Sequence, residues 1–171
     1  GLHTQFVDVT LGGDKQKIFA LYPDSLELAR DSYIRFNTDA NFTQPMRQWA
    51  DYMGNVSSPA YLYWWNWRPM VNGSDEYGSF HAAEIAYVFN DFAMFDIDVS
   101  DREEAFSETM MTIWTNFAKK SNPSSEGVVD WPAYNVGEPM TVIIGSEIGL
   151  EKGVRSEQVR EITAGYNARR D

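Results

Sequence analysis

The first third of the chain has apolar residues at intervals of three and four, which is the spacing of one helix face. We predict a helix that is capped by Asp24 or Ser25 and ends near Phe36, and a second helix that begins near Thr43 and ends at Gly54. The apolar segment 18–22 before them fits either a strand or the approach to a helix. The predicted apolar stripes of the two helices are Leu26, Ala29, Tyr33 and Phe36, and Met46, Trp49, Ala50 and Met53.

Residues 60–67 have a different pattern, which predicts a buried strand. The segment is rich in aromatic residues, as strands often are. Both of its alternating faces are largely apolar, with Leu62 and Trp64 on one face and Tyr63 and Trp65 on the other. Strands that are apolar on both sides usually lie in a mostly parallel sheet between layers of helices.

The second half of the chain predicts a helix, a strand and another helix. Ser100 and Glu103 have the spacing of a capping box, in which each side chain accepts a hydrogen bond from the backbone N–H of the other. The helix that they open is stopped by Pro123, a strand follows at 140–144, and Ser156 caps a last helix. The inward stripe of the first helix is predicted to be Phe106, Met110, Ile113, Trp114 and Phe117, and that of the last to be Val159, Ile162 and Tyr166.

These elements predict an α/β fold that the chain does not complete. Isolated pairs of strands are marginally stable, so the two or three strands of this chain need neighbours. We therefore interpret residues 1–171 as part of one α/β domain, in which helices accompany strands from the edge of a larger sheet. An unpaired strand edge is a template for pairing with another chain, and we expect the isolated chain to associate with itself.

Composition and charge narrow the range of partners. The chain is 43% hydrophobic, which suffices for a core, and its mean hydropathy of −0.42 favours a soluble protein. No apolar run approaches the roughly 20 residues that span a bilayer. The net charge of −11 disfavours nucleic acid as a partner, because phosphate contacts need clustered Lys and Arg. The compartment stays open, since an exported parent protein is compatible with the same composition.

The reactive residues narrow the chemistry. There is no cysteine, which excludes disulfides, Cys-ligated zinc and thiol nucleophiles. The two histidines, His3 and His81, are too few for a His-rich metal site, and we expect neither a metal nor a cofactor. His81 follows the polar segment 68–78 beyond the end of a predicted buried strand, where open α/β sheets bind ligands. Because the pKa of histidine lies near neutrality, His81 is a candidate general base.

The residues around His81 resemble a known motif. The run Gly78–Phe89 is similar to the histidine motif of type-B carboxylesterases, Gly-x-x-His-Gly-x-Glu-(Ile/Leu)-x-(Tyr/Phe)-Val-Phe. Further elements of that family occur in the same order with compatible gaps. They are Asp39, Phe42 and Pro45-x-Arg47 upstream, and Trp114-Thr115-Asn116-Phe117-Ala118, Asn122-Pro123 and Trp131-Pro132-x-Tyr134 downstream. The resemblance covers about residues 18–134 and implies the carboxy-terminal part of a cholinesterase-like α/β-hydrolase.

This resemblance implies a carboxylic-ester hydrolase with a Ser-His-acid triad, in which His81 is the general base. In this fold the serine and the acid precede the histidine along the chain. Neither Gly73-Ser74 nor Gly145-Ser146 has the Gly-x-Ser-x-Gly pattern of the nucleophile, so the serine, the acid and the oxyanion-hole glycines are expected before residue 1. The substrate of the whole protein is expected to be a small-molecule carboxylic ester, and the isolated chain is expected to be inactive.

Three residues near His81 carry further expectations. The resemblance implies that Glu84 is a buried carboxylate behind the groups that touch substrate, and not the acid of the triad. The alternative is an ordinary carboxylate in the first turn of a helix, where the helix dipole favours it. Ala82 replaces the glycine that follows the histidine in the family and is expected to narrow the site with its methyl group, and Asn90 replaces a frequent glycine.

Two other functions are compatible with the sequence. Cholinesterase-like adhesion proteins share this fold and bind partners without the catalytic serine, and the upstream sequence would separate them from an enzyme. An independent helical binding module could use the aromatic segment 60–67 as a ligand surface. A stripe such as Phe106, Met110 and Trp114 is more often core, so an exposed groove lined by tryptophan would favour this second alternative.

Overall fold

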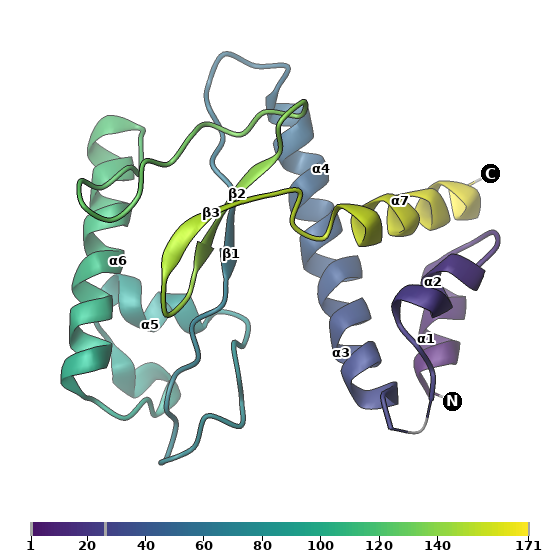
Figure 1. The fold of residues 1–171 in the computed structure, drawn as a ribbon, viewed down its shortest axis with the longest axis horizontal. Coiled ribbons are helices and arrows are strands. Elements are labelled where there is room, and N and C mark those ends of the chain that lie inside the picture. The colour runs from purple at the N-terminus through teal and green to yellow at the C-terminus, as the bar shows by residue number, and fades with distance from the viewer. Residues whose placement is uncertain (1, 26, 171) are drawn as a thin grey trace. The chain divides into compact units, whose positions relative to one another are not determined.

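The computed structural model describes the backbone of residues 2–25 and 27–170 and the side chains of residues 4–25 and 27–170. The chain divides into two compact units. Unit 1 consists of the residues up to Asn55 together with those from Gly153 onwards, and unit 2 is Val56–Lys152. Unit 1 is helical, whereas in unit 2 helices pack against a sheet (Figure 1). Leu26, which the sequence places on a helical stripe, lies outside the described residues.

The core of unit 1 is built from both ends of the chain. Its α-helices are α1 (Leu2–Thr10), α2 (Gln16–Leu21), α3 (Ala29–Thr38), α4 (Gln44–Met53) and α7 (Ser156–Arg170). Because α2 contains Ile18, the segment 18–22 belongs to a helix and not to a strand. Its buried side chains form one cluster with those of α1, α3 and α7. The members of this cluster are Val7, Leu11, Ile18, Tyr22, Phe36, Ala40 and Ile162.

Helix α3 begins later than the sequence predicts and continues into α4. The residue before its first turn is Leu28, with no side-chain cap, so the predicted cap at Asp24 or Ser25 is wrong. A π-helical turn, η1 (Asp39–Thr43), joins α3 to α4 and places Asp39 in the interior. The predicted start of the second helix near Thr43 agrees with α4, but no break separates the two helices.

The buried face of α4 differs from its predicted apolar stripe. Trp49 is 61% exposed, whereas Gln44 and Arg47 are buried. The Gln44 side-chain amide donates a hydrogen bond to Thr163 Oγ1 at 3.2 Å. The Arg47 guanidinium donates to the carbonyl oxygen of Val154 at 3.1 Å. Hydrogen bonds to distant residues therefore turn a polar face inward, and the spacing of apolar residues contains no signal for them.

Unit 2 contains a sheet of three strands in the order β1–β2–β3. Strand β1 (Tyr63–Trp65) runs parallel to β2 (Met140–Ile144), and β2 forms an antiparallel hairpin with β3 (Ile148–Lys152). The parallel pair confirms the predicted α/β class. Strand β1 is shorter than the predicted segment 60–67. The pattern of apolar residues does not predict β3, because most residues of this strand are exposed.

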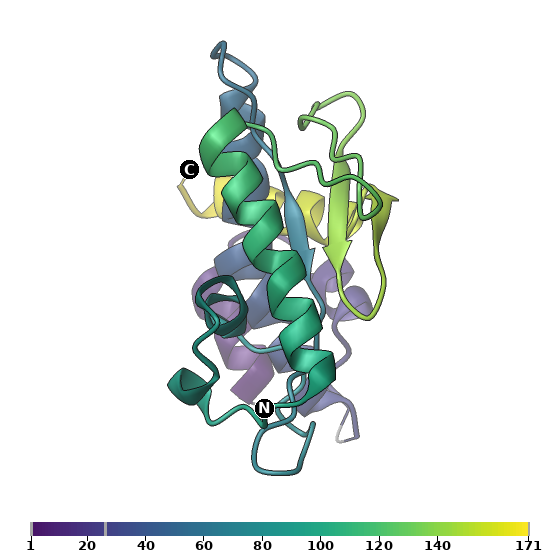
Figure 2. The ribbon, with the colours of Figure 1, turned by 90° about the vertical axis from the view of Figure 1, so that its left-hand side faces the viewer.

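Helices α5 (Ala83–Phe89) and α6 (Asp101–Lys120), between which the 3-10 turn η2 (Phe92–Phe95) lies in the sequence, cover one face of this sheet (Figures 1 and 2). The Trp65 ring of β1 packs against them, with centroid distances of 5.6 Å to Tyr87 and 5.8 Å to Phe106. Trp64, on the opposite face of β1, and Trp65 are both half-buried, and Tyr63 is 36% exposed. Within the described residues neither face of β1 is therefore fully buried, although the sequence predicts burial on both.

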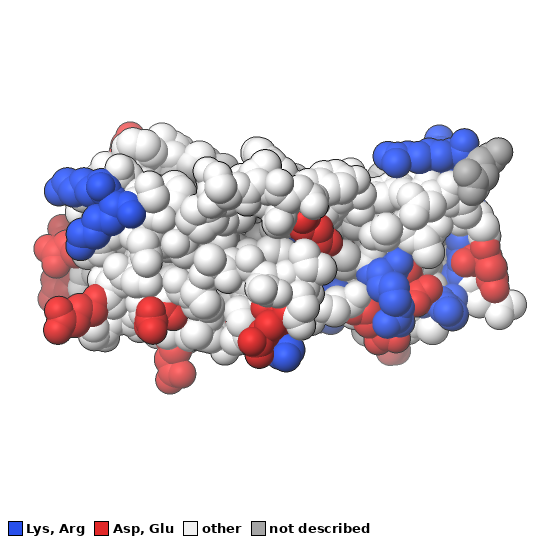
Figure 3. All heavy atoms as spheres, turned by 90° about the horizontal axis from the view of Figure 1, so that it is seen from above, with Lys and Arg blue, Asp and Glu red and all other residues white. Residues whose placement is uncertain are grey.

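On the face shown in Figure 3, Lys and Arg lie in several separate groups, and Asp and Glu are spread over the same face. A search of the residues that the structure describes finds no helix long and apolar enough to cross a membrane.

Candidate active site

His81 lies in the turn between the loop after β1 and the start of α5, and it is exposed. The loop 66–82 is held by its own residues and by the segment before α6. Val71 forms bridges with Ser74 and Ile97, and the backbone N–H of Gly73 donates to the Asp98 carboxylate at 2.6 Å. The structure thus carries His81 on a loop that follows the carboxyl end of the parallel strand β1 and is held at several points.

The residue after His81 has a left-handed backbone. Ala82 has φ of +68° and directly precedes the first turn of α5. This conformation costs about 1–2 kcal/mol for a residue with a Cβ atom, and glycine adopts it freely. The glycine of the motif therefore has a conformational reason, and the methyl group of Ala82 strains the turn beside His81. Asn90 has φ of +52° at the end of α5, where asparagine is among the best tolerated residues after glycine.

Glu84 lies in the first turn of α5 and is half-buried. Its carboxylate lies close enough to the Tyr63 hydroxyl of β1 to affect the pKa of that hydroxyl. Burial, followed by the negative charge of Glu84, raises the pKa of Tyr63 to about 12, so Tyr63 remains protonated at neutral pH. Glu84 therefore lies near β1, and it also has the helix-terminal position that the dipole favours. This geometry is compatible with both interpretations of Glu84.

A second carboxylate, Glu103, is fully buried at the start of α6. Its backbone N–H donates to Ser100 Oγ at 3.4 Å, which is one half of the predicted capping box. The other half is wrong, because the Glu103 side chain turns into the interior. There the carboxylate accepts hydrogen bonds from Trp67 Nε1 at 2.8 Å and from the Tyr87 hydroxyl at 2.6 Å. The Arg102 guanidinium donates to it at 2.6 Å as well.

The burial of Glu103 has a consequence for Tyr87. Burial, and then the hydrogen bond to the Glu103 carboxylate, raises the pKa of Tyr87 above its usual value. Tyr87 therefore stays protonated and keeps donating to Glu103. The sequence has no signal for this pair, because the spacing of Ser100 and Glu103 is that of a helix cap.

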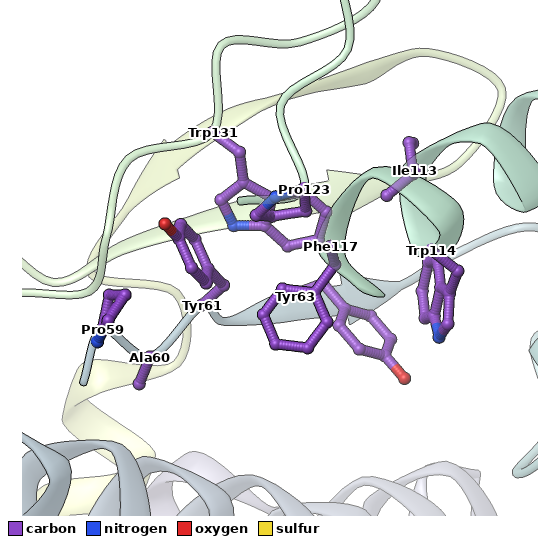
Figure 4. A pocket seen from close by; sticks show the side chains of 9 residues that line it. All are labelled: Pro59, Ala60, Tyr61, Tyr63, Ile113, Trp114, Phe117, Pro123 and Trp131. Atoms are coloured by element: carbon purple, nitrogen blue, oxygen red, sulfur yellow. The ribbon is translucent and has the colours of Figure 1, made fainter. Parts of the chain in front are cut away.

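Unit 2 also contains a pocket of about 180 Å³ beside the start of β1 (Figure 4). Its walls are mostly aromatic, and their rings meet edge to face: Tyr61 and Phe117 at 6.0 Å, and Tyr63 and Trp114 at 5.5 Å between centroids. Such a pocket can accept an apolar group. Its lining residues are Pro59, Ala60, Tyr61, Tyr63, Ile113, Trp114, Phe117, Pro123 and Trp131.

The described residues do not form a complete set of catalytic groups. The sequence contains no Gly-x-Ser-x-Gly pattern, and Ser74 and Ser146 lie in tight turns without it. Among the residues that the structure describes, no three His, Asp or Glu side chains lie close enough to hold a metal ion. An exposed imidazole such as that of His81 can take part in proton transfer.

Comparisons of this sequence with a family model and with individual proteins all identify carboxylesterases. The model of the carboxylesterase family matches residues 15–162. The chain is 32% identical over 151 residues to the para-nitrobenzyl esterase of Bacillus subtilis (strain 168), an alignment that covers 86% of this chain and 29% of that esterase. It is 29% identical over 133 residues to the liver carboxylesterase of Sus scrofa, which covers 76% of this chain and 23% of that protein.

Solved structures agree with the sequence comparison. A thermophilic pNB esterase superposes with a TM-score of 0.73 at 32% identity, over 91% of this chain and 32% of that chain. A second pNB esterase structure superposes with the same TM-score at 33% identity, over 91% of this chain and 31% of that one. The chain thus spans about a third or less of these relatives and has part of the α/β-hydrolase fold. The family match and the mixed sheet argue against an independent helical binding module, although Trp114 and Trp131 line the pocket of unit 2.

Proposed function

Because this chain belongs to the carboxylesterase family, we propose that it is the histidine-bearing segment of a serine carboxylic-ester hydrolase. His81 is the general base of a Ser-His-acid triad in this proposal, and the serine and the acid precede residue 1 in the whole protein. One observation carries the proposal. His81 is exposed on a held loop beyond the carboxyl end of β1, which is the edge at which open α/β sheets bind their ligands.

In the proposed chemistry His81 acts in turn as general base and general acid. His81 accepts the proton of the serine hydroxyl as the serine oxygen attacks the ester carbonyl carbon, and it then protonates the leaving alcohol as the ester C–O bond breaks. The product of this step is an acyl-serine. Water then attacks the acyl group, His81 takes one proton from that water, and it returns the proton to the serine as the carboxylic acid leaves.

In this proposal Glu84 supports the turn and is not the acid of the triad. Its carboxylate lies near the Tyr63 hydroxyl of β1 at the start of α5, and His81 precedes that helix by two residues. We propose that this proximity holds the first turn of α5 against the sheet. A shift of this turn would move His81 with it.

The proposed substrate is a small-molecule carboxylic ester, bound in a site that the whole protein completes. The chain aligns with only 29% of the Bacillus subtilis relative and contains no nucleophile elbow. We therefore propose that the isolated chain does not hydrolyse esters. The remaining alternative is a cholinesterase-like adhesion protein, which would have the same fold and no turnover.

The proposal is tested by ester hydrolysis with the whole protein and with the isolated chain. On a short-chain aryl ester, His81→Ala in the whole protein is expected to lower kcat by at least about 1,000-fold, because the serine loses its base. His3→Ala is the matched control, since it removes the other histidine of the chain, and it is expected to retain full activity. The isolated chain is expected to show no turnover above buffer.

Two results would overturn parts of this proposal. Turnover by the isolated chain that His81→Ala abolishes would show that the chain contains its own nucleophile. A folded whole protein that does not hydrolyse a panel of esters, and in which His81→Ala changes nothing, would identify the non-catalytic adhesion relative instead.

A further inference from the structure

The Glu103 carboxylate connects the two ends of the loop that carries His81. Trp67 lies two residues beyond β1 and opens this loop, and Tyr87 lies in α5, the helix that follows it. Both donate hydrogen bonds to the same atom, Glu103 Oε2, from Trp67 Nε1 at 2.8 Å and from the Tyr87 hydroxyl at 2.6 Å. Glu103 belongs to α6, a separate helix of 20 residues, so one carboxylate ties both ends of the loop to a third element.

Other side chains contact both faces of the Trp67 ring and fix its orientation. The Phe106 ring stacks on it at 3.6 Å between centroids, with an angle of 6° between the planes. The Arg102 guanidinium lies over the Trp67 ring at 3.8 Å from its centroid. Because both faces are covered and Nε1 is bonded to Glu103, the side chain has little freedom to tilt or slide.

Hydrogen bonds from two serine side chains to the backbone connect these anchored residues to the segments on either side of His81. The carbonyl oxygen of Trp67 accepts a hydrogen bond from Ser79 Oγ at 2.8 Å, and Ser79 precedes His81 by two residues. On the other side of His81, the carbonyl oxygen of Tyr87 accepts a hydrogen bond from Ser107 Oγ of α6 at 2.7 Å. The turn containing His81 thus lies between two segments that α6 holds.

The buried Glu103 carboxylate provides directional hydrogen bonds, which apolar packing does not. Burying a charged group is costly unless it is paired and hydrogen-bonded, and an apolar side chain would fill the same volume without that cost. Hydrogen bonds, however, are directional, so the two bonds to Oε2 determine how Trp67 and Tyr87 are oriented. Arg102, whose side chain is 51% exposed, neutralises the carboxylate from the solvent side with a bond to Oε1 at 2.6 Å.

We propose that Glu103 is a positioning residue for His81 and acts through Trp67 and Tyr87. This inference rests on the proposed function, in which His81 is the general base. Glu103 does not touch the substrate. Its effect is geometric: displacing a catalytic group by about 1 Å can lower the rate roughly 100-fold.

The first test replaces the carboxylate in the whole protein. Glu103→Gln keeps the size of the side chain but removes its charge, and its NH₂ group meets either the Arg102 guanidinium at the Oε1 position or both Trp67 Nε1 and the Tyr87 hydroxyl at the Oε2 position. We expect kcat on a short-chain aryl ester to fall about 10- to 100-fold with KM changed less than about 2-fold, as when a group that orients a catalytic residue is lost. Glu104→Gln, an exposed carboxylate one residue further along α6, is the matched control and is expected to leave both constants unchanged.

The second test measures the loop itself and needs no esterase activity. In the whole protein, Glu103→Gln is expected to speed hydrogen exchange in residues 68–82, while exchange in α7 of unit 1 stays the same. Ser79→Ala removes the exposed hydroxyl that bonds to the Trp67 carbonyl oxygen, and it is not expected to impair folding. In the whole protein it should lower kcat about 3- to 10-fold, the loss of one neutral hydrogen bond.

The outcomes separate this inference from the proposed function. If Glu103→Gln lowers the melting temperature but leaves kcat of the folded protein unchanged, and Ser79→Ala has no effect, Glu103 is only structural and the inference is wrong. Unchanged exchange in residues 68–82 would also overturn it. If His81→Ala leaves kcat unchanged, the proposed function fails instead, whereas the exchange experiment still reports whether Glu103 holds the loop.

Discussion

The residue directly after His81, Ala82, has a strained backbone conformation. Ala82 must adopt a φ of +68° for α5 to begin where it does, with Glu84 in its first turn. The strain is small relative to the packing of α5 against α6, so the turn persists. The methyl group of Ala82 nevertheless destabilises the left-handed backbone conformation of this turn.

Ala82→Gly is therefore expected to stabilise the chain. Removing the Cβ atom relieves about 1–2 kcal/mol of backbone strain, and the greater freedom of glycine in the unfolded chain offsets about 0.5–1 kcal/mol of this. The net gain should be about 0.5–1 kcal/mol, measured by urea denaturation. Ala105→Gly, at an exposed position inside α6, is the control and should destabilise by about 1 kcal/mol. A loss of stability in Ala82→Gly would contradict this explanation of the turn.

At the scale of elements, β1 is paired on one side only. Within the described residues it bonds to β2, and the sheet ends at β1 on its other edge. Trp64 lies on the face of β1 that α5 and α6 do not cover and is half-buried. An open edge next to a large apolar side chain is the arrangement from which strand pairing between chains begins.

The isolated chain is expected to self-associate through this edge. Light scattering across a concentration series should show an average mass above that of the monomer. Trp64→Lys should lower that mass, because a charged side chain beside the edge opposes pairing. Tyr77→Lys, at a loop position that is 66% exposed, is the control and should leave the mass unchanged. Circular dichroism of both variants verifies that they are folded. A monomer at every concentration would contradict the prediction.

At the scale of the whole molecule, an ion pair between Asp39 and Arg155 joins distant parts of the chain within unit 1. The Asp39 side chain is 1% exposed and that of Arg155 is 25% exposed. Arg155 Nε donates to both oxygens of the Asp39 carboxylate, at 3.2 and 3.1 Å, and the Tyr22 hydroxyl donates to it at 2.7 Å. The pair therefore joins the turn between α3 and α4 to the start of α7, and Tyr22 adds the end of α2.

Asp39→Asn should loosen unit 1 selectively. Removing one partner of a fully buried pair costs about 3–5 kcal/mol, and the partial exposure of Arg155 reduces our expectation to about 2–3 kcal/mol. Denaturation should show this loss, and hydrogen exchange should rise in α3, α4 and α7 more than in α6. Glu27→Gln, at an exposed position of the same unit, is the control. Equal loss of protection in α6 would show that the two units unfold together.

The elements that the sequence predicted correctly are those whose signals are local. Helix α6 begins after Ser100 as its cap predicts, and Phe106, Met110 and Ile113 of its stripe are buried. Strand β2 has the predicted bounds. The errors have a different origin. The buried face of α4 and the inward turn of Glu103 depend on partners far away in the sequence, and hydrophobic periodicity does not identify such partners.

By itself the sequence determined the family and the place of His81, because both are encoded in short runs of neighbouring residues around a predicted strand and helix. It also indicated, through Ala82, a departure from the motif. Only the tertiary structure decided why that departure matters, since the left-handed φ arises where the loop must meet α5. The same holds for Glu103: its carboxylate leaves the predicted cap and meets Trp67 and Tyr87 only because folding brings both donors to one oxygen atom.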